Sequence, residues 1–310
     1  MNFSKPRYWD DKFSFISLLL LPISFIIVVL ALLKKSITHK IKHKIKVICV
    51  GNLYLGGTGK TPLAIDIVKT LKKHGKKTTL IKKFYKNHID EFNLIKSNKI
   101  SYFSDKNRNI AILKAKKNKY KVVVLDDGFQ DPSFYKDLSI ICFNEKQLIG
   151  NGRIIPAGPL RESMRSLKNS KIIVINGKKN IKFEQKILAI SKSIEIYYSK
   201  YKPVNTNEFK NYNLIAFAGI GNPENFFSLL KESKFKVKKT ISYPDHYKFS
   251  KNELLKIIST AKKNNLKIIT TEKDYYRIKH FKLKDIRYLK TKLEIKNKNK
   301  LIKNILEYIK

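Results

Sequence analysis

Residues 47–62 read Val47-Ile-Cys-Val-Gly-Asn-Leu-Tyr-Leu-Gly-Gly-Thr-Gly-Lys-Thr-Pro62. A strand-like run at 46–50 leads into a glycine-rich turn that ends in Gly-Lys-Thr, and a helix-like stretch at 63–71 follows. In such a turn the backbone N–H groups and the helix N-terminus surround a phosphate, while the lysine and the hydroxyl reach the outer phosphates and a magnesium ion. The strict pattern has glycine five positions before Gly59, where this chain has Tyr54. We therefore predict a variant phosphate loop that binds a nucleoside triphosphate through Gly56, Gly57, Thr58, Gly59, Lys60 and Thr61.

A second polar feature is a pair of acids at the end of an apolar run. The residues Val-Val-Val-Leu at 122–125 are followed by Asp126, Asp127, Gly128, Phe129 and Gln130. An aspartate at the tip of a strand beside a phosphate loop orients magnesium, and two adjacent carboxylates repel each other unless a cation is near. The pair therefore predicts a Mg²⁺ site next to the phosphate loop.

The remaining pattern predicts an α/β fold with two domains. Strands at 46–50, 78–81, 121–125, 138–143 and 171–175 alternate with helices that include 61–74 and 108–117, which is typical of a doubly wound parallel sheet like that of P-loop NTPases. A second set follows, with strands at 214–218, 235–242 and 267–270 and helices at 223–231 and 251–263; Ser250 and Glu253 form a capping box for the last helix. We expect a P-loop kinase domain at 46–200, a smaller α/β domain at 201–310, and a substrate cleft between them.

The N-terminal part of the chain contains an apolar segment. Residues 15–33 carry no charge and are interrupted only by Ser17, Pro22 and Ser24. Nineteen helical residues at ~1.5 Å each would just cross a hydrocarbon core of ~30 Å, although Pro22 could divide the segment, and a buried core helix is the alternative. We expect residues 1–45 to be membrane-associated, either spanning the bilayer or lying on its surface. The lysines that follow the segment place the rest of the protein on the cytoplasmic side.

Composition limits the class of protein. The 310 residues are 43% hydrophobic and carry a formal net charge of +42. Lysine is abundant throughout, so the charge reflects a general bias and does not by itself predict nucleic-acid binding. The basic stretch at 34–46 suits anionic lipid headgroups, at about 1 kcal/mol per cation. The two cysteines, Cys49 and Cys142, lie in predicted strands, as is usual for buried, unreactive thiols in a reducing compartment.

Together these motifs resemble the tetraacyldisaccharide 4'-kinase family, the lipid A kinases of Gram-negative bacteria. The resemblance extends over nearly the whole chain. Its motifs, in order, are Tyr8-Trp9 before the apolar segment, residues 50–53 with 56–62, 126–130, Gly150-Asn151-Gly152-Arg153 through 156–162, 218–223, Pro244-Asp245-His246 and 271–274. The blocks at 150–162 and 244–246 are far more specific than the phosphate loop, which many enzymes share.

The resemblance implies an activity, its cofactors and its site residues. ATP and Mg²⁺ would serve to phosphorylate the 4'-hydroxyl of an acylated glucosamine disaccharide 1-phosphate, giving lipid IVA at the cytoplasmic face of the inner membrane. The implied catalytic residues are Asp90 as the base, His246 that tunes it, and Lys60. The implied metal ligands are Thr61, Asp127 and Glu91, and the implied substrate contacts are Asp126, Gln130, Arg161 and Glu162. We also expect inner-membrane lipid as a partner, no nucleic acid, and a monomer.

The chain departs from the family pattern at several positions. Lys82-Lys83-Phe84-Tyr85 stand where the family usually has Ser-Arg-Gly-Tyr, Phe92 replaces a proline, and Asp131 replaces a histidine. The segment before Asp90 is also shortened. These changes affect the surroundings of the nucleotide and the sugar, whereas the phosphate loop and the strand-tip acids are retained.

Two other functions use similar sequence features. A membrane-associated P-loop ATPase acting as a switch or metallochaperone would hydrolyse ATP to drive assembly, and we would expect it to lack the block at 150–162. A nucleic-acid-binding ATPase is suggested by charge alone and predicts salt-sensitive binding to DNA or RNA. The chain lacks recognition motifs that interleave aromatic and basic residues, which argues against the second alternative.

Overall fold

The structure is a computed structural model that describes residues 5–85 and 89–310. The chain forms two compact units, each with its own sheet. The larger unit contains Lys5–Phe84, Ile100–Lys200 and Glu294–Lys310, and the smaller contains Tyr85–Lys99 and Tyr201–Leu293. The α/β class predicted from the sequence is confirmed. The segments 85–99 and 294–310 each belong to a different unit from the residues before them, which no feature of the sequence indicated.

The larger unit is built on an eight-stranded sheet with the order β12-β7-β6-β5-β1-β4-β2-β3. Its strands are β1 (Lys46–Gly51), β2 (Thr78–Lys83), β3 (Tyr102–Asp105), β4 (Val122–Asp126), β5 (Leu138–Asn144), β6 (Ile172–Asn176), β7 (Glu195–Pro203) and β12 (Thr291–Ile295). All pairs from β3 to β7 are parallel. Strand β12 runs antiparallel to β7, since Lys296 N–H donates to the Tyr198 carbonyl and Val204 N–H to the Lys290 carbonyl. The sheet is therefore mixed, whereas the sequence predicted a parallel one.

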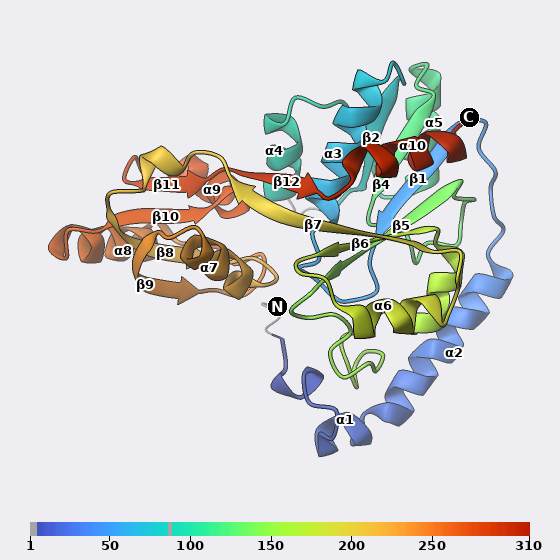
Figure 1. Ribbon diagram of the computed structural model, residues 1–310, viewed down its shortest axis with the longest axis horizontal. Helices are drawn as coiled ribbons and strands as arrows, with labels where there is room; N and C mark the ends of the chain where they lie inside the picture. Colours follow the sequence, from blue (N-terminus) through green and yellow to red (C-terminus); the bar gives the residue numbers. More distant parts are fainter. Residues whose placement is uncertain (1–4, 86–88) are drawn as a thin grey trace. The chain divides into compact units, whose positions relative to one another are not determined.

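Helices cover both faces of this sheet. They are α3 (Lys60–Lys73), α5 (Arg108–Lys117), α6 (Ile181–Leu188) and α10 (Lys298–Tyr308). Side chains of α5 and α6 pack in one apolar cluster with Val47 and Cys49, which are alternate residues of β1. Helices α3 and α10 pack against each other (Figure 1). Both cysteines are buried and unpaired, and burial raises the pKa of Cys49 to about 11 and that of Cys142 to about 12. Neither thiol is ionised at neutral pH, as expected for core residues.

The smaller unit contains a four-stranded parallel sheet with the order β11-β10-β8-β9. Its strands are β8 (Asn213–Ala218), β9 (Lys236–Ser242), β10 (Lys267–Thr271) and β11 (Ile286–Leu289), and its helices are α4 (Ile89–Ser97), α7 (Pro223–Glu232), α8 (Lys251–Lys263) and α9 (Glu272–Ile278). The predicted capping box of α8 is confirmed, because Ser250 and Glu253 bond reciprocally. Helix α4 lies between β2 and β3 in sequence, yet it packs on α9. The smaller unit thus takes one helix from within the sequence of the larger.

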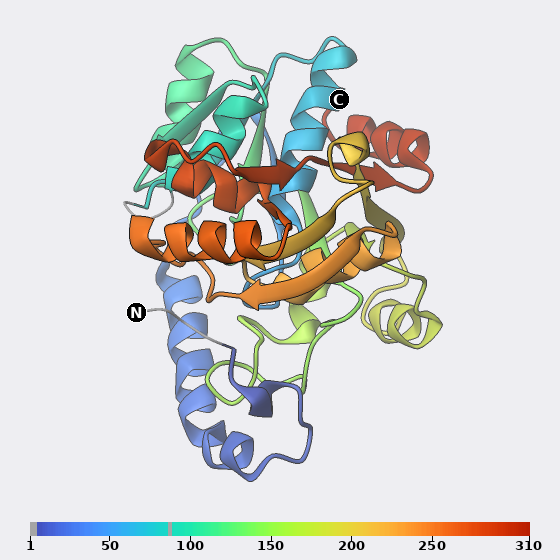
Figure 2. The same ribbon diagram turned by 90° about the vertical axis from the view of Figure 1, so that its left-hand side faces the viewer.

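The apolar N-terminal segment is divided into two helices. Only Leu20 separates helix α1 (Phe15–Leu19) from helix α2 (Leu21–Ile37) (Figure 2). Pro22 lies in the first turn of α2. Proline fits the first turn of a helix but disrupts a helix interior, which accounts for the place of the break. Within the described ranges, no helix combines the length and the apolar character needed to cross a bilayer.

The two serines of this segment attach it to the larger unit. Ser24 Oγ donates to the Ile154 carbonyl at 2.9 Å and accepts from Ala157 N–H at 3.0 Å, while Ser17 Oγ donates to the Ala157 carbonyl. Arg153 Nη1 lies 2.7 Å from Ser17 Oγ. The serines are therefore the inward face of the hairpin α1–α2, and most of its large apolar side chains point outward; Phe15 and Phe25, for example, are 71% and 69% exposed.

Candidate active site

The phosphate loop follows β1 and ends at the first residue of α3. Gly56 and Gly59 have φ angles of +86° and +87°, in the left-handed region that favours glycine. Gly59 is the N-cap of α3, so Lys60 and Thr61 occupy the first two positions of the helix. The Thr58 side chain is buried and its hydroxyl has no hydrogen-bond partner among the described residues. This geometry provides the helix N-terminus and the backbone donors that a phosphate group requires.

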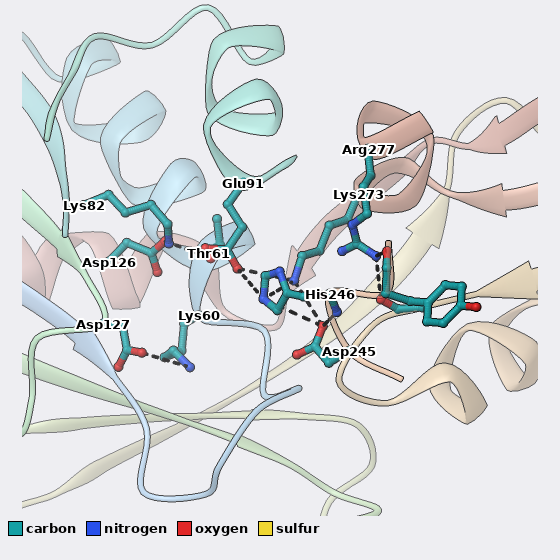
Figure 3. A network of polar contacts seen from close by, with 12 residues as sticks. Lys60, Thr61, Lys82, Glu91, Asp126, Asp127, Asp245, His246, Lys273 and Arg277 are labelled. Carbon is teal, nitrogen blue, oxygen red and sulfur yellow. Dashed lines mark hydrogen bonds and ion pairs between the residues drawn. The ribbon is translucent and has the colours of Figure 1, made fainter. Parts of the chain in front are cut away.

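The two acids at the end of β4 point to different partners (Figure 3). Asp126 is buried, and its Oδ2 accepts from Thr61 Oγ1 at 2.8 Å and from Lys82 Nζ at 2.5 Å. Asp127 lies in the left-handed region with φ +65°, which turns the chain sharply after the strand. Both of its oxygens accept from Arg161 Nη1 at 3.0 Å, and Lys60 Nζ lies 3.7 Å from Oδ2. Consecutive residues of the phosphate loop, Lys60 and Thr61, thus each contact a different acid.

The charges of this cluster perturb one another. Burial by itself would raise the pKa of Asp127, but the Lys60 ammonium and the Arg161 guanidinium outweigh it and lower that pKa to about 2. Burial lowers the pKa of Lys60, and Arg161 adds to that effect, while Asp127 opposes it. Three cations, Lys60, Lys82 and Arg161, therefore surround two carboxylates. The excess of positive charge suits a polyanionic ligand.

The residues present fit a magnesium ion at Asp126. Its Oδ1 is buried and has no hydrogen-bond partner in the described part of the chain, and the Thr61 hydroxyl contacts its other oxygen. No group of three His, Cys, Asp or Glu side chains able to hold a metal occurs in the described ranges. Magnesium is often held by one or two protein oxygens together with phosphates and water, so Thr61 and Asp126 suffice. The metal ligands predicted from the sequence were Thr61, Asp127 and Glu91; in the structure both oxygens of Asp127 accept from Arg161, and Glu91 contacts Lys273 and His246 in the smaller unit.

The block at 150–162 supports the phosphate loop from the side. Leu55 N–H donates to the Pro159 carbonyl at 2.9 Å and Arg161 N–H to the Leu53 carbonyl at 2.7 Å. Gln130 also supports this region, since its Nε2 donates to the Asn52 carbonyl at 2.9 Å. Glu162 is half-buried, and burial raises its pKa. Of the four predicted substrate contacts, Asp126, Gln130 and Arg161 therefore also hold the site together.

Arg108 is a site residue that sequence reasoning missed. Its Nη1 lies 2.9 Å from Asp131 Oδ2, and its Nη2 donates to the Asp127 carbonyl. Asp131, where the family usually has histidine, thus holds an arginine against the turn after β4. One signal could have found it: the chain has only seven arginines among its 66 basic residues. Arginine is favoured where a planar, multidentate donor is required.

A second cluster lies in the smaller unit. Asp245 and His246 follow β9, and His246 has a φ angle of +58°. Lys273 Nζ, from α9, lies 3.2 Å from His246 Nε2, 3.3 Å from Glu91 Oε1 and 3.4 Å from Asp245 Oδ1. Glu91, from α4, is 3.8 Å from His246 Nε2 (Figure 3). A strained backbone at a cluster of ionisable groups is typical of functional sites.

A buried network fixes this cluster to the small sheet. Asp274, adjacent to Lys273, is fully buried and accepts from Gly219 N–H at 3.0 Å and from Arg277 Nη1 at 2.9 Å. Burial raises the pKa of Asp274, and Arg277 opposes that shift. Because the network joins α9 to the end of β8, it sets the position of Lys273.

The predicted catalytic pair is described only in part. Asp90 is the second residue of α4, and its side chain lies outside the described part of the structure. The next residue, Glu91, contacts His246, so the first turn of α4 is close to that histidine. Lys273 and Asp245 were not predicted as site residues, although both belong to motifs that carry the family resemblance.

Comparison with known proteins supports the same interpretation. The chain matches the family model described as tetraacyldisaccharide-1-P 4'-kinase over residues 16–102 and 90–310. A tetraacyldisaccharide 4'-kinase of Pelagibacter ubique (strain HTCC1062) is 43% identical over 311 residues, which cover 98% of each protein. One of Rickettsia canadensis (strain McKiel) is 33% identical over 320 residues, covering 97% of this chain and 96% of that protein.

A solved structure shares the fold. The crystal structure of LpxK from Aquifex aeolicus in complex with ATP aligns with a TM-score of 0.69 at 24% identity. The alignment covers 95% of this chain and 100% of that one, so the similarity of fold includes both units.

Proposed function

Because the chain belongs to the tetraacyldisaccharide-1-P 4'-kinase family and is a phosphotransferase of that kind, we propose which of its residues bind ATP and transfer the phosphoryl group. The observation that carries the proposal is the pairing of Lys60 and Thr61 with two different acids. The backbone of residues 56–59 and the Lys60 ammonium hold the β- and γ-phosphates of ATP. Thr61 and Asp126 hold Mg²⁺, which, when bound, neutralises charge on the phosphate oxygens.

Arg161 and Asp127 position the reacting groups. The Asp127 carboxylate contacts both the Lys60 ammonium and the Arg161 guanidinium. Both cations are thereby directed at the phosphate loop without needing to move during the reaction. Preorganised charges of this kind stabilise a phosphoryl transition state more than mobile ones.

The acceptor is an acylated glucosamine disaccharide 1-phosphate, and Asp90 accepts the proton of its 4'-hydroxyl. His246 tunes that base; Lys273 contacts its ring, and Asp245 accepts from its backbone N–H at 3.0 Å. A lysine ammonium has only donors, so its contact with His246 Nε2 is made with that nitrogen as the acceptor. The histidine proton is then on Nδ1. We further expect a monomer that binds no nucleic acid.

A direct transfer assay tests this proposal. The purified protein is incubated with γ-labelled ATP and the tetraacylated disaccharide 1-phosphate, and we expect label to appear in a bisphosphorylated lipid. An acceptor that already carries a 4'-phosphate is the matched control and should take up no label. Hydrolysis of ATP with no labelled lipid would support the switch or metallochaperone ATPase instead.

We also propose that the hairpin α1–α2 attaches the protein to the surface of the membrane. The two serines face the larger unit, and the outward side presents Phe15, Phe25, Leu30 and similar residues to the surroundings. Lys34 and Lys35 follow in the last turn of α2, where they suit anionic headgroups. A helix of this kind lies in the interface with its apolar face in the lipid.

Substituting Phe25 and Leu30 with glutamate should detach the protein from lipid. Each large side chain contributes ~1.5–3 kcal/mol when buried, so we expect the affinity for vesicles of phosphatidylglycerol and phosphatidylethanolamine to fall by roughly 10²–10⁴-fold. Ile110→Glu with Leu113→Glu on α5 is the control, since these apolar residues are also exposed. These substitutions test the apolar surface more specifically than a deletion of residues 1–33, because the deletion would also remove the contacts of Ser17 and Ser24. Equal co-sedimentation of both double variants would contradict the proposal.

A further inference from the structure

The phosphate-loop cluster contains a buried lysine that the mechanism above does not use. Lys82 is near the end of β2, and its side chain is 7% exposed. In the parallel register of β2 and β4, Lys82 lies directly opposite Asp126. Its Nζ is 2.5 Å from Asp126 Oδ2, the oxygen that also accepts from Thr61 (Figure 3). The lysine is therefore fixed by strand register, and its position does not depend on a flexible loop.

Stability alone gives a poor reason for this arrangement. Lysine is almost never buried unless it is paired, and the desolvation of a buried pair offsets much of its Coulomb energy. Replacement of such pairs by apolar residues is often neutral or stabilising. The pair lies beside Thr61, where the outer phosphates and magnesium are bound in the proposed function. A functional role at that place is thus the better explanation.

We propose that Lys82 is a second phosphate-binding cation, which shares Asp126 with the magnesium ion. Without nucleotide, its ammonium neutralises Asp126 and keeps the carboxylate and the Thr61 hydroxyl together. With nucleotide and Mg²⁺ bound, Asp126 would hold the ion and the Lys82 ammonium would move to a phosphate oxygen. The four-carbon stem of lysine allows this movement without a change in β2. The inference rests on the proposed function, because it assumes that ATP and Mg²⁺ bind at this loop.

Two consequences separate this role from a purely structural ion pair. Lys82 should strengthen the binding of ATP in the absence of a divalent cation, since it supplies a positive charge where the metal is missing. It should also weaken the binding of a divalent cation in the absence of ATP, because both compete for Asp126. If the ion pair had only a structural role, its loss would change the stability of the protein. It would not change the affinity for metal-free ATP relative to the affinity for a divalent cation without ATP.

The test compares Lys82→Met with the wild-type protein by calorimetry and by Mn²⁺ electron paramagnetic resonance. We expect the affinity for ATP in EDTA to fall about tenfold to hundredfold, the size of one charged hydrogen bond to phosphate. The affinity for ATP with saturating Mg²⁺ should fall less, and Mn²⁺ alone should bind more tightly. Lys83→Met is the matched control, because successive side chains of a strand point to opposite faces.

Two further variants keep the proposal testable if Lys82→Met folds poorly. The double variant Lys82→Met with Asp126→Asn removes both charges, so no carboxylate is left buried without its cation. This double variant should still bind ATP more weakly than the wild-type protein in EDTA. Lys82→Arg should retain that affinity. An unchanged ratio of metal-free to Mg²⁺-dependent ATP affinity in the Lys82 variants would overturn the proposal. Failure of the wild-type protein to bind ATP under any condition would instead overturn the proposed function.

Discussion

Replacing Lys60 by alanine is expected to lower kcat by at least 10²–10³-fold while leaving the fold intact. Removal of one preorganised charge-stabilising group typically has an effect of this size. The fold should tolerate the change, because burial and the nearby Arg161 lower the pKa of Lys60 and so make its charge costly to hold. Arg161 still neutralises Asp127 in the variant. Single-turnover transfer of labelled phosphate and thermal unfolding are the two measurements.

The control for this variant is Lys73→Ala, which removes an exposed lysine from the other end of the same helix. It should leave both transfer and the unfolding temperature unchanged. A folded Lys60→Ala protein with near-normal turnover would remove the phosphate loop from the mechanism. A loss of activity that accompanies unfolding would show only that the charge cluster supports the fold, and Lys60→Met, which keeps the apolar stem, would then decide the matter.

Replacing Asp90 by alanine is expected to lower kcat by roughly 10²–10⁴-fold, the usual contribution of a general base. The KM for ATP should change little, since the nucleotide contacts lie elsewhere. His246→Ala should have a smaller effect. The double variant should lose little more than Asp90→Ala alone, because residues that act as one unit are not additive. Steady-state kinetics of the four proteins gives this double-mutant cycle.

His74→Ala, at an exposed histidine that ends α3, is the control for the cycle. Multiplicative losses would mean that His246 acts independently of Asp90, for example by positioning the lipid. An unchanged kcat in Asp90→Ala would exclude it as the base. Asp127 would then be a poor substitute, since its pKa of about 2 makes it a weak proton acceptor, and Asp131 is paired with Arg108. Glu91, which itself contacts His246, would be the residue to test next.

Features that depend on neighbouring residues could be predicted from the sequence. The strand β1, the glycine turn and α3 follow one another within some thirty residues, and apolar periodicity with glycine positions determines them. The same holds for α5 and for the capping box of α8. The break in the apolar N-terminus was foreseen from Pro22, but the serines seemed only to interrupt the apolar run. Their role as the docking face depends on carbonyl groups near residue 155 and could not be predicted locally.

Features that depend on pairing between distant segments could not be predicted. The sequence predicted a strand that ends at residue 81; the structure continues it to Lys83. Lys82 can be buried only because β4 brings Asp126 opposite to it. The two acids have different partners for the same reason, because the loop at 159–161 places Arg161 beside Asp127. Strand β12 pairs with β7 across the sequence of the smaller unit, and nothing in residues 291–295 indicates that partner.

The interleaved sequence of the two units has a consequence for how the protein folds during synthesis. Helix α4 leaves the ribosome long before α9, the helix on which it packs, and at ~5–20 residues per second the delay is roughly ten to thirty-five seconds. Its buried Ile95 has no partner from α9 during that time. The larger unit cannot be completed until α10 has been synthesised, because Lys298 of α10 pairs with Asp66 of α3 at 2.7 Å. The smaller unit likewise cannot be completed until β11 has been made, so each unit exposes apolar surface while the segments that cover it are still being synthesised.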